Sequence, residues 1–314
     1  MPNFVLPFSK ISKKDVKKAG GKGASLGEMT GIKLPVPPGF VVLANAFEKY
    51  LKDTDINVEI EAALDKVSVK DVNSVERTSS KIRDLIHDFK VSLDIKKQIE
   101  KAFDNLKSKF VAVRSSATAE DSKIASWAGE LETYLFVDKK NLMDKVRTCW
   151  SSLYTPRAIF YRFEKGLHKR KVGVAVVVQD MIDSEVSGVA FTVHPVTRDK
   201  NQMVIEAVLG QGEAIVSGQV TPDTYVIDKE DDYIVDINIS EQKEKIAYKK
   251  NGGTKKVKIV NKDIGKQKLS GQEIIGLSKI CSQIEKHYRH PQDIEWARAK
   301  NKFYITQSRP ITTL

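Results

Sequence analysis

The chain has 314 residues, 41% of them hydrophobic and 30% charged, with a formal net charge of +11 and a pI near 9.3. This composition is typical of a globular protein with one large or two modest domains, and it predicts no membrane span because no apolar run approaches the ~20 residues that cross a bilayer. The two cysteines, Cys149 and Cys281, lie far apart, which excludes a disulfide framework and a cysteine zinc site and predicts a cytoplasmic protein.

Helical and strand-like periods alternate along the chain, which predicts a fold of the mixed α+β class. Helical spacing of apolar residues is found after Gly23 and over 45–51, 75–89, 93–106, 142–163 with an interruption near Pro156, and 270–288. Strands are predicted over 110–113, 172–178, 189–193 and 203–207, with a hairpin over 247–260 that turns at Gly252-Gly253. Ser270 and Glu273 form a capping box, which makes the last helix the clearest.

A glycine-rich segment, Gly20-Gly21-Lys22-Gly23, precedes the first predicted helix. Glycines allow backbone N–H groups to approach a phosphate closely, and the N-terminus of a helix favours negative charge. Lys22 would then contact the phosphate as a point charge. The segment is not a Walker A loop, since Gly23 stands where that motif has serine or threonine. A tight turn before a helix explains the segment equally well.

The strand predicted over 110–113 is followed by Arg114-Ser115-Ser116. An arginine at the end of a strand can hold a phosphate through two parallel hydrogen bonds. The sequence is equally compatible with a structural role, in which Arg114 pairs with Glu120 or Asp121.

Two further segments carry small or polar residues where a ligand can approach. Gly129, followed by Thr133, permits the backbone to lie against a flat ring or a phosphate, although a simple turn before a strand has the same composition. Gln179 ends the apolar run over 174–178. Its amide suits the edge of an adenine, but a hydrogen-bonded core glutamine is the commoner case.

The end of the chain predicts a β-hairpin with strands over 294–296 and 303–305. On adjacent strands Glu295 and Gln307 would converge, with Arg309 just beyond them. A carboxylate and an amide oxygen suit Mg²⁺, and an arginine beside them suits phosphates. An edge hairpin with solvated polar ends is the alternative interpretation.

Taken together, these segments resemble the ATP-binding domain of the phosphoenolpyruvate synthase family, whose relatives include pyruvate phosphate dikinase and rifampicin phosphotransferase. The resemblance covers essentially the whole chain. The segments that carry it, in chain order, are Gly20–Gly23 with Pro37–Phe40, Val113–Asp121, Ala128-Gly129 with Thr133-Tyr134, Gln179, Gly212–Ala214 with Ser217-Gly218, Asp293–Trp296, and Gln307–Pro310.

The resemblance implies an ATP-grasp-like fold that holds ATP in a cleft between two lobes, expected over residues 1–190 and 191–314. It implies transfer of a phosphoryl group from ATP to a histidine on a swivelling domain, as in phosphoenolpyruvate synthesis from pyruvate. The residue roles it implies are phosphate binding by Lys22 and Arg114, nucleotide contacts by Gly129, Thr133 and Gln179, Mg²⁺ binding by Glu295 and Gln307, and charge neutralisation by Arg309. Lys22, Arg114 and Arg309 are the expected catalytic residues.

This sequence departs from the family pattern in several places. The phosphorylatable histidine, in a Gly-Gly-x-Thr-x-His context, and the pyruvate-binding barrel are absent. We therefore expect an ATP-binding module, either a piece of a longer enzyme or a separate subunit, that needs a histidine-bearing domain or chain as partner. His194 stands where family members usually have Asn or Asp, and we interpret it as a hydrogen-bonded structural residue. Gln211 replaces a leucine, which we interpret as a minor packing change.

Three alternatives stay open at this stage. The final acceptor could be rifampicin or a similar small molecule, or the module could bind nucleotide for regulation without turnover. The third alternative is a basic nucleic-acid-binding protein. We do not expect a nucleic-acid partner, because we interpret the lysines as spread along the chain and no RNP, KH or helix-turn-helix signature is present.

Overall fold

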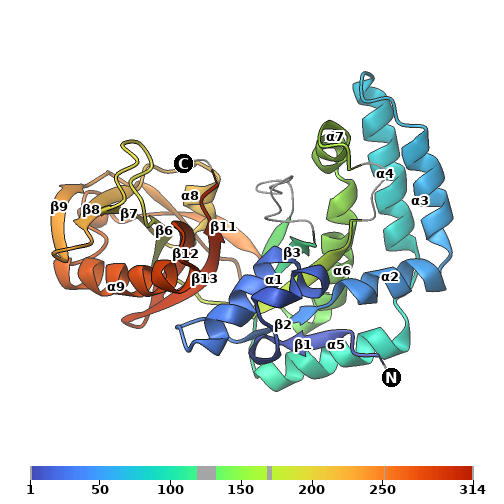
Figure 1. Cartoon of the computed structure of the whole chain (residues 1–314), viewed down its shortest axis with the longest axis horizontal. Helices are drawn as coiled ribbons and strands as arrows, with labels where there is room; N and C mark the ends of the chain where they lie inside the picture. Colours follow the sequence, from blue (N-terminus) through green and yellow to red (C-terminus); the bar gives the residue numbers. More distant parts are fainter. Residues whose placement is uncertain (1, 119–131, 168–171, 251, 313–314) are drawn as a thin grey trace. The chain divides into compact units, whose positions relative to one another are not determined.

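The computed structural model describes residues 2–118, 132–167, 172–250 and 252–312. The chain divides into two compact units (Figure 1). Unit 1 consists of Met1–Gly31 and Pro38–Met181, and unit 2 consists of Ile32–Pro37 and Ile182–Leu314. The division lies after Met181 rather than after residue 190, because the strand Val186–Phe191 lies inside the sheet of unit 2.

Unit 1 is built on a five-stranded antiparallel sheet in the order β1-β2-β5-β3-β4. Its strands are β1 (Val5–Pro7), β2 (Gly39–Val42), β3 (Val111–Ala117), β4 (Thr133–Val137) and β5 (Val174–Asp180). Its helices are α1 (Val16–Gly31), α2 (Ala44–Asp53), α3 (Ile56–Asp65), α4 (Val72–Asp88), α5 (Leu93–Leu106), α6 (Lys139–Ser151) and α7 (Pro156–Glu164), with short 3₁₀ turns at Phe8–Lys10, Lys13–Asp15 and Ser152–Tyr154.

Helices cover both faces of this sheet, which is why β5 begins with five consecutive apolar residues, four of them valines, rather than with an alternating pattern. The Val174 and Val176 side chains lie in the main hydrophobic core of unit 1, on the face that packs against α2, α5 and α6. Helix α4 packs on α6 and adds Ile82 and Ile86 to the same core. The indole of Trp150 in α6 stacks on Phe47 and Tyr50 in α2, with ring centroids 5.3 Å apart in both cases. The opposite face of β3 and β5 packs against α1.

Unit 2 is built on a six-stranded antiparallel sheet in the order β13-β12-β6-β7-β8-β9. Its strands are β6 (Val186–Phe191), β7 (Gln202–Leu209), β8 (Asp223–Asp228), β9 (Tyr233–Asn238), β12 (Gln292–Ala299) and β13 (Lys302–Pro310). A separate two-stranded hairpin pairs β10 (Glu244–Tyr248) with β11 (Thr254–Lys258). The helices are α8 (Glu213–Val216) and α9 (Gly271–Tyr288), with a 3₁₀ turn at Asn261–Asp263.

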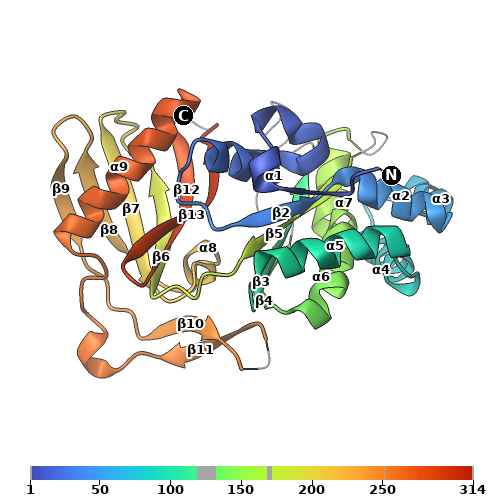
Figure 2. The same ribbon diagram turned by 90° about the horizontal axis from the view of Figure 1, so that it is seen from below.

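Helix α9 covers one face of the six-stranded sheet, and Figure 2 shows it lying across β7, β8 and β9. Its start matches the predicted capping box, since Ser270 Oγ accepts a hydrogen bond from Glu273 N–H and the Glu273 carboxylate accepts one from Ser270 N–H. The predicted apolar stripe, including Leu277 and Cys281, is buried. The last helix predicted from the sequence is therefore confirmed.

The predicted α+β class is also confirmed, and the differences from the expected elements have local causes. The predicted interruption near Pro156 is confirmed, since α6 ends at Ser151 and α7 begins at Pro156. Proline occupies the first turn of α7, where its missing N–H costs nothing, and Thr155 caps that helix. Helix α3 and strands β8 and β9 were not predicted. Strand β9 lies at the edge of the sheet and its residues are mostly exposed, so no apolar alternation marks it.

A buried ion pair ties the hairpin segment to the six-stranded sheet. Lys268 Nζ lies 2.6 Å from Asp223 Oδ1, and both side chains are fully buried. Asp223 also accepts hydrogen bonds from Tyr225 Oη at 2.8 Å and from the backbone N–H groups of Ser240 and Lys268. Because Ser240 precedes β10 and Lys268 follows β11, one carboxylate holds both ends of this segment.

We expect Lys268→Met to lower the free energy of unfolding by about 3–5 kcal/mol, because it leaves the Asp223 carboxylate buried without its counter-charge. Urea unfolding followed by circular dichroism measures this. Lys266→Met is the matched control, since the ion pair of Lys266 with Asp263 is exposed, and it should leave the unfolding midpoint unchanged. Equal effects of the two substitutions would contradict a structural role for the buried pair.

Candidate functional site

Three of the residues singled out in the sequence lie on one face of the unit 1 sheet. Arg114 in β3 is paired with Thr133 in β4 and with Val177 in β5. Gln179 lies two residues beyond Val177, so it projects from the same face. Arg114 and Gln179 are buried, whereas Thr133 is exposed at the start of its strand. The sheet register therefore places these three side chains together.

Helix α1 lies over this same face and carries Lys22. The helix is kinked at Gly20, which has φ 69° and ψ 172°, and helical geometry resumes at Gly21. The glycine-rich segment is therefore a kink inside a helix rather than a loop before one. A Cβ atom at residue 20 would lie 2.1 Å from Ser116 Oγ, so only glycine allows α1 to approach β3 this closely.

Ser116 fixes the kink from the β3 side. Its hydroxyl donates a hydrogen bond to Ala19 C=O at 3.0 Å and accepts one from Gly23 N–H at 3.3 Å. The Ser116 side chain thus bridges the two halves of α1 from strand β3. Arg114 lies two residues earlier in β3, so its side chain projects from the same face as that of Ser116. This arrangement positions Lys22 relative to Arg114.

Two of the sequence interpretations for unit 1 concern residues outside the described part of the chain. These are the nucleotide contact predicted for Gly129 and the alternative pairing of Arg114 with Glu120 or Asp121. Gln179 is 2% exposed, which fits the core-glutamine alternative as well as a contact to an adenine edge.

In unit 2, the predicted C-terminal hairpin is confirmed. Strands β12 and β13 are joined by a two-residue turn, Lys300-Asn301, in which both residues have positive φ, as the turn that matches the twist of a hairpin requires. Glu295 is the cross-strand partner of Gln307, and Asp293 is the cross-strand partner of Arg309.

A β-bulge in β13 decides which face carries these groups. Trp296 is paired with Ile305 but Glu295 is paired with Gln307, so Thr306 is the extra residue. Side chains alternate along a strand, and one inserted residue moves all later side chains to the other face. Ile305 is therefore in the core with Trp296, while Gln307 and Arg309 share the opposite face with Glu295.

Asp293 is a part of this group that the sequence interpretation missed. Its Oδ2 accepts hydrogen bonds from Arg309 Nε at 2.8 Å and Nη2 at 2.6 Å. Burial raises the pKa of Asp293, with a smaller contribution from Glu295 in the same direction, and Arg309 opposes both. The alternation Asp293-Ile294-Glu295 was the available signal, since residues two apart on a strand share a face.

Glu206 in β7 is a second group that was not predicted. The register runs from Glu295 through Val189 in β6 to Glu206, so both carboxylates project from one face. Burial raises the pKa of Glu206, and Asp293 adds to this shift. The unit 2 face thus carries three carboxylates, one amide and one guanidinium.

The donor chemistry of this face fits one magnesium ion that is shared with a ligand. Among the described residues, no group of three or more His, Cys, Asp or Glu side chains is arranged to hold a metal by itself. Glu295 and Gln307 offer a carboxylate and an amide oxygen as cross-strand partners. Mg²⁺ is commonly bound by one or two protein oxygens, with phosphate oxygens and water completing its shell.

His194 has a structural role in the turn after β6. Its Nδ1 accepts hydrogen bonds from Val196 N–H and Thr197 N–H, both at 3.2 Å. An Asn or Asp side-chain oxygen commonly accepts from backbone N–H groups just downstream in this way, which explains how histidine can replace them here. The structural interpretation of His194 is supported by these contacts.

The family model described as the pyruvate phosphate dikinase AMP/ATP-binding domain matches residues 16–314. The chain belongs to this family. It is 45% identical to a probable phosphoenolpyruvate synthase of Methanocaldococcus jannaschii over 99% of this chain and 27% of that protein. It is 46% identical to a probable phosphoenolpyruvate synthase of Archaeoglobus fulgidus, over 99% and 42%.

A rifampicin phosphotransferase of Bacillus cereus is 38% identical over 100% of this chain and 36% of that protein. The chain therefore spans less than half the length of each of these three relatives. The family resemblance stated from the motifs is confirmed, and the chain is an ATP-binding module of this family.

Among solved structures, the D-alanine-D-alanine ligase of Helicobacter pylori matches with a TM-score of 0.31 and 12% identity, over 69% of this chain and 46% of that one. None of the helices that the structure describes is long and apolar enough to cross a bilayer.

We expect ATP affinity to fall as the pH is lowered from about 8 to about 5.5, with part of the loss due to Asp293. Because burial raises the pKa of Asp293, this carboxyl group takes up a proton at a higher pH than an exposed aspartate does. Protonation removes the charge that holds Arg309. Asp293→Asn should therefore bind ATP about tenfold more weakly at pH 8 and show a flatter pH profile.

Isothermal titration across this pH range measures both effects. Asp236→Asn is the control, because Asp236 is an exposed aspartate in β9 of the same unit, and its profile should match that of the unchanged chain. If Asp293→Asn and the unchanged chain lose affinity with the same pH slope, Asp293 does not act through its charge.

Proposed function

We propose that this chain binds Mg-ATP and transfers a phosphoryl group from ATP to a histidine on another domain or chain, as in phosphoenolpyruvate synthesis. One observation carries the proposal: Glu295 with Gln307, and Asp293 with Arg309, form two neighbouring cross-strand pairs on one sheet face. They occur in a chain that belongs to an ATP-binding family. A metal-ligating pair next to an anchored guanidinium is suited to a polyphosphate.

In this proposal, each unit contributes its own set of groups. In unit 1, Lys22 and Arg114 bind phosphate oxygens, while Thr133 and Gln179 contact the rest of the nucleotide; Gly129 is proposed as a further contact. Arg114 is 7% exposed, and its charge acts more strongly on a phosphate in such a poorly solvated position than it would in water.

In unit 2, Glu295 and Gln307 hold magnesium and Arg309 neutralises charge on the transferring group. Magnesium, when bound, supplies neutralisation of the phosphate oxygens. Phosphoryl transfer requires little covalent chemistry from a protein, so positioning and charge neutralisation supply most of the catalysis. Asp293 is a positioning residue, since it contacts Arg309 and acts through it.

The acceptor is proposed to be a histidine outside this chain, because the sequence lacks the family's phosphorylatable histidine motif. The relatives named as phosphoenolpyruvate synthases favour pyruvate as the final acceptor. A second candidate is an antibiotic-inactivating enzyme, and it is favoured by the 38% identity to a rifampicin phosphotransferase over the whole chain. A regulatory module without turnover would not need the complete set of charged groups.

Calorimetric titration with ATP, with and without Mg²⁺, tests the site. We expect Mg²⁺ to strengthen ATP binding and Glu295→Ala to abolish this strengthening, because the carboxylate is the charged protein ligand of the metal. Glu230→Ala, an exposed glutamate in the same unit, should behave as the unchanged chain. Unaltered magnesium dependence in Glu295→Ala would remove the metal assignment.

We expect Lys22→Ala and Arg114→Ala each to weaken ATP binding by about tenfold or more, since each removes a charge-assisted contact to phosphate. Lys18→Ala is the matched control, because Lys18 is an exposed lysine in the same helix that pairs with Asp15. Circular dichroism should show that all three variants fold. If Lys18→Ala weakens binding as much as Lys22→Ala does, the contribution of Lys22 is only a general effect of surface charge.

A further inference from the structure

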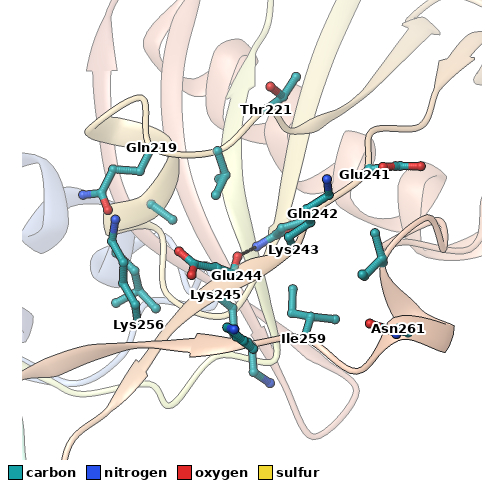
Figure 3. A pocket seen from close by; sticks show the side chains of 15 residues that line it. Gln219, Thr221, Glu241, Gln242, Lys243, Glu244, Lys245, Lys256, Ile259 and Asn261 are labelled. Carbon is teal, nitrogen blue, oxygen red and sulfur yellow. Dashed lines mark hydrogen bonds between the residues drawn. The ribbon is translucent and has the colours of Figure 1, made fainter.

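Unit 2 contains a cavity that shares no lining residue with the proposed ATP-binding set. Its volume is about 610 Å³, and its walls come from α8, the loop that follows it, and the β10–β11 hairpin (Figure 3). Ala214, from the Gly212–Ala214 segment that the family resemblance highlights, lines the cavity, and we assign this segment no role in binding ATP. A pocket of this size is in the range that holds small organic ligands.

Gly210 explains how the hairpin reaches this position. It has φ 87°, and a Cβ atom there would lie 2.4 Å from the carbonyl oxygen of Ile246 in β10. The next residue, Gln211, donates its backbone N–H to that same oxygen at 2.9 Å. The buried Gln211 side chain also donates to Asp183 at 3.3 Å, so this residue does more than fill space and the packing interpretation is corrected. The glycine is required for the hairpin to contact the end of β7.

Other contacts hold the hairpin in place. The buried Gln242 side chain accepts a hydrogen bond from Leu209 N–H at 2.8 Å and donates to Leu209 C=O at 3.0 Å. Thr254 in β11 donates to the Glu213 carboxylate of α8 at 3.1 Å. With the Asp223–Lys268 ion pair at its base, the hairpin is attached at several points. The cavity is therefore formed before any ligand binds, which reduces the ordering cost of binding.

The charge of this segment is concentrated rather than spread. Residues 243–268 include ten lysines and two acidic residues, which corrects the interpretation that the lysines are distributed along the chain. Lys266 and Lys268 form ion pairs with Asp263 and Asp223. Within the described part of the chain, Lys256 and Lys258 of β11 form no ion pair. This segment alone therefore accounts for much of the net positive charge.

The cavity has an apolar floor and a positively charged rim. Four lysines line it, at positions 243, 245, 256 and 258, against two glutamates at positions 241 and 244. Aliphatic side chains that include buried Ala214 and Ile246 form the floor. The lining also includes neutral polar side chains, and Figure 3 shows Lys256 extending toward one of them, Gln219. The lining is thus suited to a ligand with an apolar portion and an anionic group.

We propose that this cavity binds an organic monophosphate with a flat apolar portion, of the class of nucleoside monophosphates. The phosphate would contact Lys256 and Lys258, which lie two residues apart on one face of β11. The flat portion would lie on the aliphatic floor, and the amides of Gln219 and Asn261 would contact its heteroatoms. This site is separate from the proposed phosphoryl-transfer site.

Photolabelling with 8-azido-AMP, followed by peptide mapping, tests the proposal. The experiment uses the whole chain with Lys22→Ala and Glu295→Ala, so that labelling at the proposed ATP site is weakened. We expect label in peptides that cover residues 211–223 or 243–264. Excess AMP should suppress it, whereas adenosine at the same concentration should not, because adenosine lacks the anionic group.

A matched pair of double variants locates the phosphate contact. Lys256→Ala with Lys258→Ala should reduce the label in these peptides about fivefold, whereas Lys262→Ala with Lys266→Ala, outside the cavity, should leave it nearly unchanged. Equal losses in the two double variants would overturn the proposal in favour of general attraction to a basic surface. Label confined to other peptides, or no label at all, would overturn it as well. A failed ATP titration would leave this result unaffected.

Discussion

A single extra residue in β13 determines the chemistry of unit 2. If Thr306 occupied an ordinary paired position in the strand instead of forming the bulge, Gln307 and Arg309 would project to the same side as Ile305. An amide and a guanidinium buried there without hydrogen-bond partners would be destabilising. With the bulge, the strand places Ile305 on the apolar side and then presents Gln307 and Arg309 on the opposite side, each beside an acidic partner in β12. The same strand thus serves the core and the site.

The carboxylates on the polar face of the unit 2 sheet also influence one another's ionisation. Burial raises the pKa of both Asp293 and Glu206, with smaller contributions in the same direction from Glu295 to Asp293 and from Asp293 to Glu206. Arg309 compensates part of this cost through Asp293. A cation bound nearby would compensate more of it, so the face is better suited to its charges with a metal than without one. Carboxylates whose pKa values are shifted by burial and by neighbouring charges are common in functional sites.

Patterns of residues with strong local signals were read correctly from the sequence. The apolar stripe and the capping box specified α9, and the two apolar stretches at the end of the chain specified the β12–β13 hairpin. The kink at Gly20 could not be predicted, because it depends on how closely Ser116 in a distant strand approaches. The bulge at Thr306 was equally inaccessible, because no residue type marks it.

The candidate site was predicted only in part, because the sequence reveals local pairings but not the order of strands in a sheet. Glu295 and Gln307 were identified because their pairing follows from a local hairpin. Glu206 was missed because it joins them only through the order of strands β12, β6 and β7, which is a property of the whole sheet. The lysines of the hairpin segment were visible in the sequence, but their significance depends on the cavity that α8 closes.

The short segment Ile32–Pro37 lies in unit 2 although it is flanked on both sides by unit 1 sequence. Pro35 C=O accepts a hydrogen bond from Ile305 N–H at 2.9 Å, so this segment covers part of the outer edge of β13, the last strand of the sheet. Uncovered strand edges pair readily with other chains. Any attempt to produce unit 2 as a fragment beginning near Ile182 would therefore expose this edge and favour aggregation, whereas a fragment that retains residues 32–37 through a redesigned connection would keep it protected.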